Sequence, residues 1–304
     1  MVRGVFIANL VVQVGIVVTG AVVRLTGSGL GCPTWPECVD GSYVPVSRQE
    51  ESWHKYIEFG NRMLTFVLVI AAVVAIAAAF WDRRARKASG LEPRPAILVL
   101  AFIPFVGTFA QAILGGITVL TGLYPATVSA HFLLSMALIA GCVVLVVRAS
   151  DAGDRPIAHL VPSAVRWLAY SLVAVSALVV VLGVLVTGSG PHSGDAESEN
   201  RYPFDPRTIS WLHADVVLLF LGLTVGLLVL LYVIHGPALA IKRTWILLGI
   251  ALAQGVIGYT QYFAGLPAVL VTIHVLGAGL VWVAVLFIPS ALRTRGVVSS
   301  SSST

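Results

Sequence analysis

The sequence predicts an all-α integral membrane protein whose eight transmembrane helices form two four-helix bundles, related to each other as parallel repeats. Two observations support this prediction. Of the 304 residues, 58% are apolar and only 11% are charged, whereas soluble domains are about one-quarter charged. In addition, the segment from Ala110 to His131 recurs from Ala253 to His274, with glutamine, glycine and histidine in register. A repeat of this kind indicates that one structural unit is built twice.

Eight apolar runs are long enough to cross a membrane, since a hydrocarbon core of about 30 Å needs roughly 20 helical residues. They lie near residues 4–25, 60–81, 95–120, 125–147, 164–187, 208–234, 244–264 and 266–289. The first run is too long for a removable signal peptide and lacks a small-residue cleavage site. We therefore interpret it as the first transmembrane helix, and little of the chain remains for a soluble domain.

The loops between the runs alternate in charge, which predicts the orientation of the chain. One set of loops carries Arg3, Arg83, Arg84, Arg86, Lys87, Arg94, Arg148, Arg155, Arg166, Lys242, Arg243, Arg293 and Arg295. The other set carries Glu37, Asp40, Glu50, Glu51, Asp195, Glu197, Glu199 and Asp205. The basic loops are expected in the cytoplasm, with both termini, in a multi-pass protein of the cell membrane. This sidedness explains the net charge of +5, and no basic stripe with interleaved aromatic residues indicates nucleic-acid binding.

The repeat also defines the expected domains. The tetrapeptide TGSG follows the first run at Thr26–Gly29 and the fifth run at Thr187–Gly190. Because each half has an even number of spans, both halves enter from the same side, as expected for an axis along the membrane normal. The expected boundaries are 1–148 for the first half, 149–163 for a cytoplasmic linker, 164–290 for the second half and 291–304 for a disordered, serine-rich tail.

Three cysteines divide into a pair and a single residue. Cys32 and Cys38 lie in the first outer loop, in the sequence CPTWPEC, and Cys142 lies in the fourth apolar run. An oxidising compartment permits a disulfide between the first two, which is the favoured interpretation. Two free thiols and a redox-active pair are the alternatives. A zinc site is disfavoured because no third or fourth ligand has suitable spacing.

Polar residues open the second and sixth spans at matching positions. In WHKYIEFGNR, the helical period places His54, Glu58 and Asn61 on one face. In TISWLHADV, His213 falls where Asn61 falls in the first half, and it lies at the level of His274 near the outer surface. Two imidazoles that face each other across a bundle are typical of axial haem ligation.

The first half has one strong ligand at the equivalent level, because His131 faces Asn61 there. Ionisable side chains inside a membrane span are costly and are functional candidates. A single histidine could be structural, but His131 and His274 at one depth in two repeats favour a ligand role.

Two arginines and two glutamines lie close to these levels. Arg24 and Arg62 could pair with haem propionates, because a guanidinium binds a carboxylate through two donors. Snorkelling to the membrane interface is the alternative. Gln111 and Gln254 are expected to form hydrogen bonds between helices rather than to act in catalysis.

Together these residues resemble the haem A synthase family, membrane monooxygenases that convert haem O into haem A. The resemblance covers residues 1–290 and rests on GLGCPTWPEC, IEFGNR, WLH and the two segments that run from AQ to a histidine. It implies a catalytic role for Glu58 and haem B ligation by His213 and His274. It further implies that His131 belongs to the substrate site and that the outer-loop cysteine pair of the family falls on Cys32 and Cys38.

One position departs from the family pattern. Family members have a histidine three residues after the glutamate, where this chain has Asn61, and an amide oxygen is a poor ligand for haem iron. Three interpretations follow: five-coordinate iron on His131, a His54 that moves in as the second ligand, or an inactive site. We favour the first, because His54 lies roughly 10 Å further along the helix axis.

The resemblance implies successive hydroxylation of one ring methyl of haem O to a formyl group, in haem A biosynthesis for cytochrome oxidase assembly. A haem B would relay electrons in the second half while haem O and O2 react in the first. Glu58 would take up a proton or stabilise a cationic intermediate; a carboxylate favoured by the helix dipole is the alternative. Expected partners are haem O, O2 and membrane lipid, with haem O synthase and a second copy of the chain as candidates. The sequence does not identify the electron donor.

Two other functions remain open at this stage. A dihaem b-type cytochrome that only transfers electrons predicts four axial histidines, and Asn61 argues against it. A transporter built on parallel repeats predicts charged or discontinuous helices at the midplane. The four candidate histidines cluster near the outer surface instead, which argues against a transporter.

Overall fold

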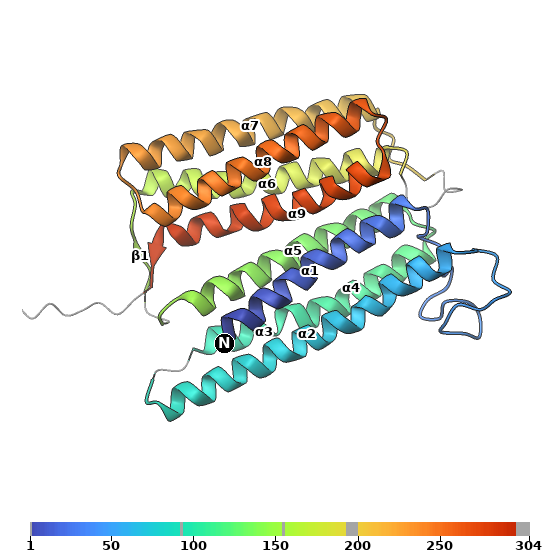
Figure 1. The fold of residues 1–304 in the computed structure, drawn as a ribbon, viewed down its shortest axis with the longest axis horizontal. Coiled ribbons are helices and arrows are strands. Elements are labelled where there is room, and N and C mark those ends of the chain that lie inside the picture. Colours follow the sequence, from blue (N-terminus) through green and yellow to red (C-terminus); the bar gives the residue numbers. More distant parts are fainter. Residues whose placement is uncertain (1, 92–93, 154–155, 193–199, 296–304) are drawn as a thin grey trace, which may run out of the picture.

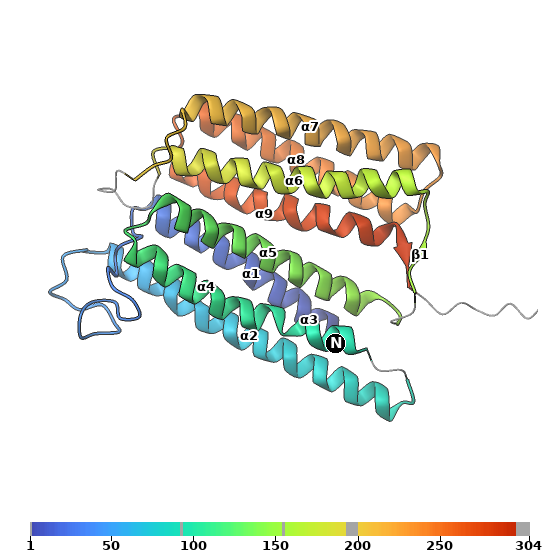
Figure 2. The ribbon, with the colours of Figure 1, turned by 180° about the vertical axis from the view of Figure 1, so that it is seen from behind.

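The computed structural model describes residues 2–91, 94–153, 156–192 and 200–295, and it shows an all-helical protein (Figures 1 and 2). In this part of the chain, eight helical segments are long and apolar enough to cross a membrane. They are α1 (Val2–Leu25), α2 (His54–Ala88), α3 (Pro95–Ala101) with α4 (Ile103–Leu120), α5 (Pro125–Ser150), α6 (Ser163–Ser189), α7 (Pro206–Val233), α8 (Ala238–Phe263) and α9 (Ala268–Ala291). The protein is therefore an all-α, multi-pass membrane protein, as predicted.

The third span differs from the single helix predicted over residues 95–120. It is divided at Phe102 into α3 and α4, and Pro104 is the second residue of α4. Proline has no N–H to donate, and its ring collides with the carbonyl four residues earlier. The break therefore follows from Pro104, which the apolar pattern alone does not reveal.

The helices pack in a simple order. The helices α1, α2, α4 and α5 lie together, and α6, α7, α8 and α9 lie together (Figure 1). Helices α1 and α5 also pack against α9, and α5 packs against α6. Side chains such as Phe6, Ile139 and Val285, which are fully buried, fill this contact region. The two groups of helices thus share one continuous core.

The turns before α5 and α9 have the same backbone conformation. Gly122–Leu123 joins α4 to α5, and Gly265–Leu266 joins α8 to α9; all four residues have positive φ. In each turn the leucine N–H donates to a carbonyl in the last turn of the preceding helix. Glycine adopts positive φ without a steric penalty. The shared turn starts both helices at matching residues, so His131 and His274 lie equally far along α5 and α9.

At the end of the bundle that carries most of the basic loops, Asp151 connects α5 to the segment after α9. Its carboxylate pairs with Arg148 at 3.0 Å and with Arg293 at 3.1 Å. Beside it, β1 (Ala158–His159) and β2 (Arg293–Thr294) form an antiparallel pair. Part of the segment expected as a disordered tail is therefore ordered.

The rest of the expected tail, residues 296–304, lies outside the described residues. Four charges that entered the loop pattern also lie outside them, namely Arg155, Asp195, Glu197 and Glu199.

Candidate functional site

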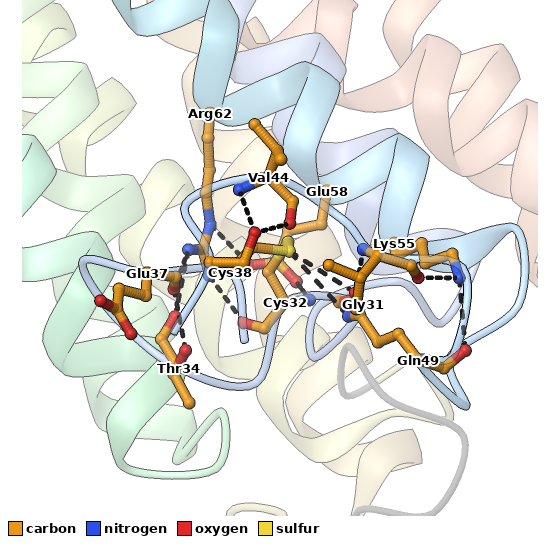
Figure 3. Close-up of a disulfide and its surroundings, with 12 residues drawn as sticks. Gly31, Cys32, Thr34, Glu37, Cys38, Val44, Gln49, Lys55, Glu58 and Arg62 are labelled. Atoms are coloured by element: carbon orange, nitrogen blue, oxygen red, sulfur yellow. Dashed lines mark hydrogen bonds and ion pairs between the residues drawn. A yellow bond between two sulfur atoms is a disulfide. The ribbon is translucent and has the colours of Figure 1, made fainter. Parts of the chain in front are cut away.

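The first outer loop is closed by the disulfide between Cys32 and Cys38, in agreement with the favoured interpretation. Both cysteines are fully buried. The loop lies over the start of α2 (Figure 3). There, Gln49 Nε2 donates to the Gly31 carbonyl at 2.6 Å, and Lys55 Nζ donates to the Val46 carbonyl at 2.8 Å. The loop is therefore attached to the helix at several points rather than exposed to solvent along its length.

Glu58 of α2 points into this loop (Figure 3). Its residue is 5% exposed. Oε2 accepts a hydrogen bond from the Cys32 N–H at 2.6 Å, and Oε1 accepts from Arg62 Nη2 at 2.6 Å and Nε at 3.1 Å. Both carboxylate oxygens therefore have charge-assisted or backbone partners, as a buried carboxylate requires.

Arg62 extends the same network to the loop backbone. Its guanidinium donates to the carbonyls of Cys32 at 2.7 Å, Thr34 at 3.0 Å and Glu37 at 3.1 Å. The sequence offered haem propionates or the membrane interface for Arg62, and in the structure it contacts Glu58 and these three carbonyls (Figure 3). Glu58 and Arg62 together hold the disulfide loop on α2.

The polar residues on either side of Glu58 are also bonded. Asn61 Oδ1 accepts a hydrogen bond from Thr19 Oγ1 of α1 at 2.8 Å. His54 Nδ1 lies 2.8 Å from Ser28 Oγ, and its ring stacks on Trp53. Asn61 thus presents an amide whose oxygen is already used by α1, and His54 is held at the outer end of α2.

In the second half, two histidines lie on helices that do not pack directly. His213 of α7 and His274 of α9 each lie about two turns after the start of their helix. Among the described helices, α6 and α8 each pack against both α7 and α9, while α7 and α9 are not in contact. The two imidazoles therefore lie on one diagonal of a four-helix group.

Glycines lie beside both rings. A Cβ atom at Gly183 of α6 would be 3.3 Å from His213 Cε1, and one at Gly258 of α8 would be 3.1 Å from His274 Cε1. The sequence interpretation included Gly258 among glycines of the repeat but missed Gly183, which lies in an apolar run without a motif. An added side chain at either position would crowd the neighbouring imidazole, so each glycine lets one ring pack close to the backbone of α6 or α8.

In the described residues, the first half of the chain shows this contact between a histidine ring and a glycine once, where the second half shows it twice. A Cβ atom at Gly115 of α4 would be 3.2 Å from His131 Cε1. Gln111 Nε2 donates to the His131 carbonyl at 3.0 Å, and Gln254 Nε2 donates to the His274 carbonyl at 2.6 Å. The predicted interhelical role of both glutamines is confirmed. Each bond holds the histidine-bearing helix against its neighbour at the residue that carries the imidazole.

The Nδ1 atoms of His131, His213 and His274 are buried and have no hydrogen-bond partner among the described residues; the Val179 backbone is near the His213 ring. An unpaired buried polar group costs about 1–3 kcal/mol, so such atoms indicate a polar or metal-containing ligand. Imidazole is the most frequent protein ligand of haem iron. Two imidazoles on one diagonal, each beside a glycine, fit a haem in the second half, and His131 with Gly115 fits one end of a similar site.

Arg24, for which haem propionates or the membrane interface were expected, contacts the backbone of the loop after α6. Its Nε donates to the His192 carbonyl at 2.6 Å, and His192 Nε2 lies 2.9 Å from the Leu266 carbonyl. Tyr202, from the same outer loop, donates to Ser129 Oγ of α5 at 3.0 Å. The sequence analysis singled out neither His192 nor Tyr202. Neither contact has a local signal, because both connect segments far apart in the chain.

Comparison with known proteins identifies the family of the chain. Residues 3–192 match the COX15-CtaA family, described as a cytochrome oxidase assembly protein. The chain is 28% identical over 176 residues to the haem A synthase of Exiguobacterium sibiricum, covering 58% of this chain and 55% of that protein. It is 31% identical over 178 residues to that of Lysinibacillus sphaericus, covering 56% and 53%, and 30% identical over 194 residues to that of Bacillus pumilus, covering 62% and 58%. These matches span a little more than half the length of those curated relatives. The chain belongs to the haem A synthase family, COX15-CtaA.

Proposed function

We propose that this protein is a haem A synthase, which oxidises a ring methyl of haem O to a formyl group by successive hydroxylations. One observation carries the proposal. The helix pairs α4–α5 and α8–α9 hold His131 and His274 in the same way, whereas the facing helices carry Asn61 in one half and His213 in the other. Two halves that share a scaffold and differ in one ligand suit one substrate site and one cofactor site.

In the second half, His213 and His274 would hold the iron of haem B. Bound haem supplies one-electron transfer chemistry, and the protein supplies its position and surroundings. Gly183 and Gly258 let the two imidazoles pack against the backbone of α6 and α8, which would leave the ring nitrogens available to a flat macrocycle. Gln254 fixes α9 against α8 at His274, so the ligand does not depend on a mobile segment.

In the first half, His131 would bind the iron of the substrate haem O. Asn61, with its oxygen bonded to Thr19, does not compete for the other face of the iron. An open face suits access of O2 to the substrate and release of the product. The halves would be residues 1–148 and 164–290, two parallel-repeat bundles joined by the linker 149–163, with both termini cytoplasmic.

We keep Glu58 as the proposed catalytic group. Its Oε1 pairs with Arg62, and its Oε2 accepts from the Cys32 N–H. A proton taken up at Oε1 would replace the pairing with Arg62, which also holds three loop carbonyls. Proton uptake at Glu58 would therefore be coupled to the position of the disulfide loop. Haem O, O2 and lipid are the proposed small-molecule partners, and haem O synthase and a second copy of the chain are candidate protein partners.

The test is extraction and chromatography of the haems bound to the purified full chain, produced in cells that also make haem O. The proposal expects haem B together with haem A or a hydroxylated intermediate, and loss of the oxidised products in Glu58→Gln. Haem B in both halves without oxidised product would instead identify a dihaem b-type cytochrome, which the recurrence of His131 in the first half makes the second candidate. A protein without haem would contradict both functions and favour a transporter.

A further inference from the structure

The disulfide loop places one aromatic side chain against α4. Trp35 lies between Cys32 and Cys38, and its ring packs on Gly116. A Cβ atom at Gly116 would be 2.6 Å from Trp35 Cε2 and 2.8 Å from Cγ, which is closer than van der Waals contact allows. Gly116 is buried, whereas Trp35 is 37% exposed. The ring therefore covers the helix on one side and faces the surroundings on the other.

The contact lies next to the candidate substrate site. Gly115 faces His131, and Gly116 faces Trp35. Consecutive residues of an α-helix point about 100° apart, so α4 carries the imidazole on one facet and the indole on the next. The loop itself is held on α2, because Arg62 binds the carbonyls of Thr34 and Glu37 on either side of Trp35 (Figure 3). Trp35 thus reaches from α2 to α4 beside His131.

The second half has no such arrangement at the matching position. Gly258 matches Gly115 in the repeat and faces His274, but the residue after it is Tyr259, which is 53% exposed. On α8 the tyrosine side chain stands at this position, whereas on α4 Gly116 leaves the matching position free for Trp35. Only the half assigned to the substrate therefore combines a glycine at this position with an aromatic residue supplied by a loop.

We propose that Trp35 is a substrate-positioning residue of the first half. By packing on Gly116, its indole closes the outer side of the His131 site between α2 and α4 and holds the flat macrocycle of haem O against α5. Aromatic rings bury large areas and favour offset or edge contacts with other ring systems, and a porphyrin offers both. This inference rests on the proposed function, because it takes haem O as the molecule bound at His131.

Two variants of the full chain disrupt the same contact from opposite sides. Trp35→Ala removes the ring, and Gly116→Ala forces it off α4. Each should raise the KM for haem O about tenfold, the size expected for loss of one aromatic contact, with a smaller change in kcat. The double variant should be no worse than either single variant, because residues that act through one contact are not additive. Tyr43→Ala, which removes an aromatic residue 67% exposed in the same loop, should leave KM unchanged.

The haem B of the second half distinguishes a positioning role of Trp35 from a purely structural one. Its absorption spectrum and stoichiometry should remain those of the wild type in every variant. Should Trp35→Ala not fold, Trp35→Phe keeps a smaller ring and should give an intermediate KM. Additive effects of Trp35→Ala and Gly116→Ala, or an unchanged KM in both, would overturn the inference while leaving the synthase function intact.

Direct binding tests the inference even if the protein proves not to oxidise haem O. Bound haem quenches the tryptophans of the chain by energy transfer, so titration with haem O gives a Kd, which should be higher for Trp35→Ala than for the wild type. Equal Kd values in the two proteins would show that Trp35 does not position haem O. Failure of turnover with a Trp35-dependent Kd would contradict the proposed function alone.

Discussion

The two halves of the molecule hold a histidine in the same way on one side and differ on the facing side. Gly115 and Gln111 hold His131 as Gly258 and Gln254 hold His274. Across from them, α7 carries His213 beside a glycine, whereas α2 carries Asn61 bonded to a threonine of α1. Under the proposed function, this difference would let one scaffold serve a resident cofactor and an exchanging substrate. Two ligands would retain a haem, and one ligand with an open opposite face would let it leave.

The halves also differ at their outer ends. The first half is covered by a disulfide loop that Glu58 and Arg62 hold on α2 (Figure 3). The second half has no disulfide among its described residues, and its outer loop sends Tyr202 to Ser129 of the first half. Both loops therefore contribute contacts to the half assigned to the substrate.

The largest expected effect separates the two histidine sites. His274→Ala should remove the haem B of the second half almost completely, because one axial ligand and its surroundings are lost together. His131→Ala should retain haem B and lose haem O binding. Pyridine haemochrome content and extracted haems measure both outcomes, with His235→Ala, in the turn after α7, as the control. Retention of haem B in His274→Ala would end the distinction between the halves.

The next effect tests the cover of the first half. Arg62→Ala should lower the free energy of unfolding by about 3 kcal/mol, because it leaves Glu58 buried without its charged partner and frees three loop carbonyls. Arg62→Lys keeps the charge but not the forked geometry, so its loss should lie between wild type and Arg62→Ala. Thermal unfolding monitored by circular dichroism gives both values. If the two variants unfold alike, the forked geometry rather than the charge holds the loop.

A third variant makes the first half resemble the second. Asn61→His, combined with Thr19→Gly to provide the space that Gly183 provides, should give a bis-histidine spectrum for the haem of the first half. Its dissociation should slow about tenfold, since a second axial ligand must be broken before release. Stopped-flow transfer of haem to apomyoglobin measures the rate. Thr19→Val with Asn61 unchanged controls for loss of the threonine hydroxyl and should leave the spectrum as in wild type.

A smaller effect compares the two glutamines. Gln254→Leu removes one interhelical hydrogen bond, and Gln111→Leu removes two, to the His131 carbonyl and to Ser135 Oγ; each is worth about 1 kcal/mol. Gln254→Leu should loosen haem B in the second half, whereas Gln111→Leu should change only haem O affinity. Haem B loss at rising temperature, followed by absorption, distinguishes them. An equal effect of both variants on haem B would show that the two glutamines do not act separately in their own halves.

The smallest effect concerns the starts of α7 and α2. Asp205 caps α7 by accepting hydrogen bonds from Thr208 N–H and Oγ1, whereas Trp53, which precedes α2, provides no side-chain cap. These hydrogen bonds lower the pKa of Asp205. The cap is therefore complete above the ordinary aspartate pKa of about 3.9 and is lost as pH falls through the lowered value.

Asp205→Asn keeps a capping oxygen without its charge, so this variant should lose that part of the acid sensitivity of α7. Thermal unfolding of the wild type and the variant between about pH 3 and pH 6 measures it. Identical pH profiles would show that the charge of Asp205 contributes nothing to the stability of the cap.

Much of the fold follows from the sequence because its causes are local. Apolar runs of spanning length predict the helices, and two neighbouring residues with positive φ, Gly122 with Leu123 and Gly265 with Leu266, start α5 and α9 in register. The levels of His131 and His274 then follow from helical rise alone. The short spacing of Cys32 and Cys38 made their disulfide predictable for the same reason. The break at Phe102 was also local, but apolar periodicity hides it.

The tertiary structure decided which groups meet. Glu58 and Arg62 lie one turn apart on α2, and nothing local indicates that they bind the backbone of a loop some 25 to 30 residues earlier. Likewise, Asn61 meets Thr19, and Trp35 meets Gly116, only because α1, α2 and α4 pack side by side. Helical periodicity determines the face on which a residue lies, but its partner depends on which helix packs against that face and at what height.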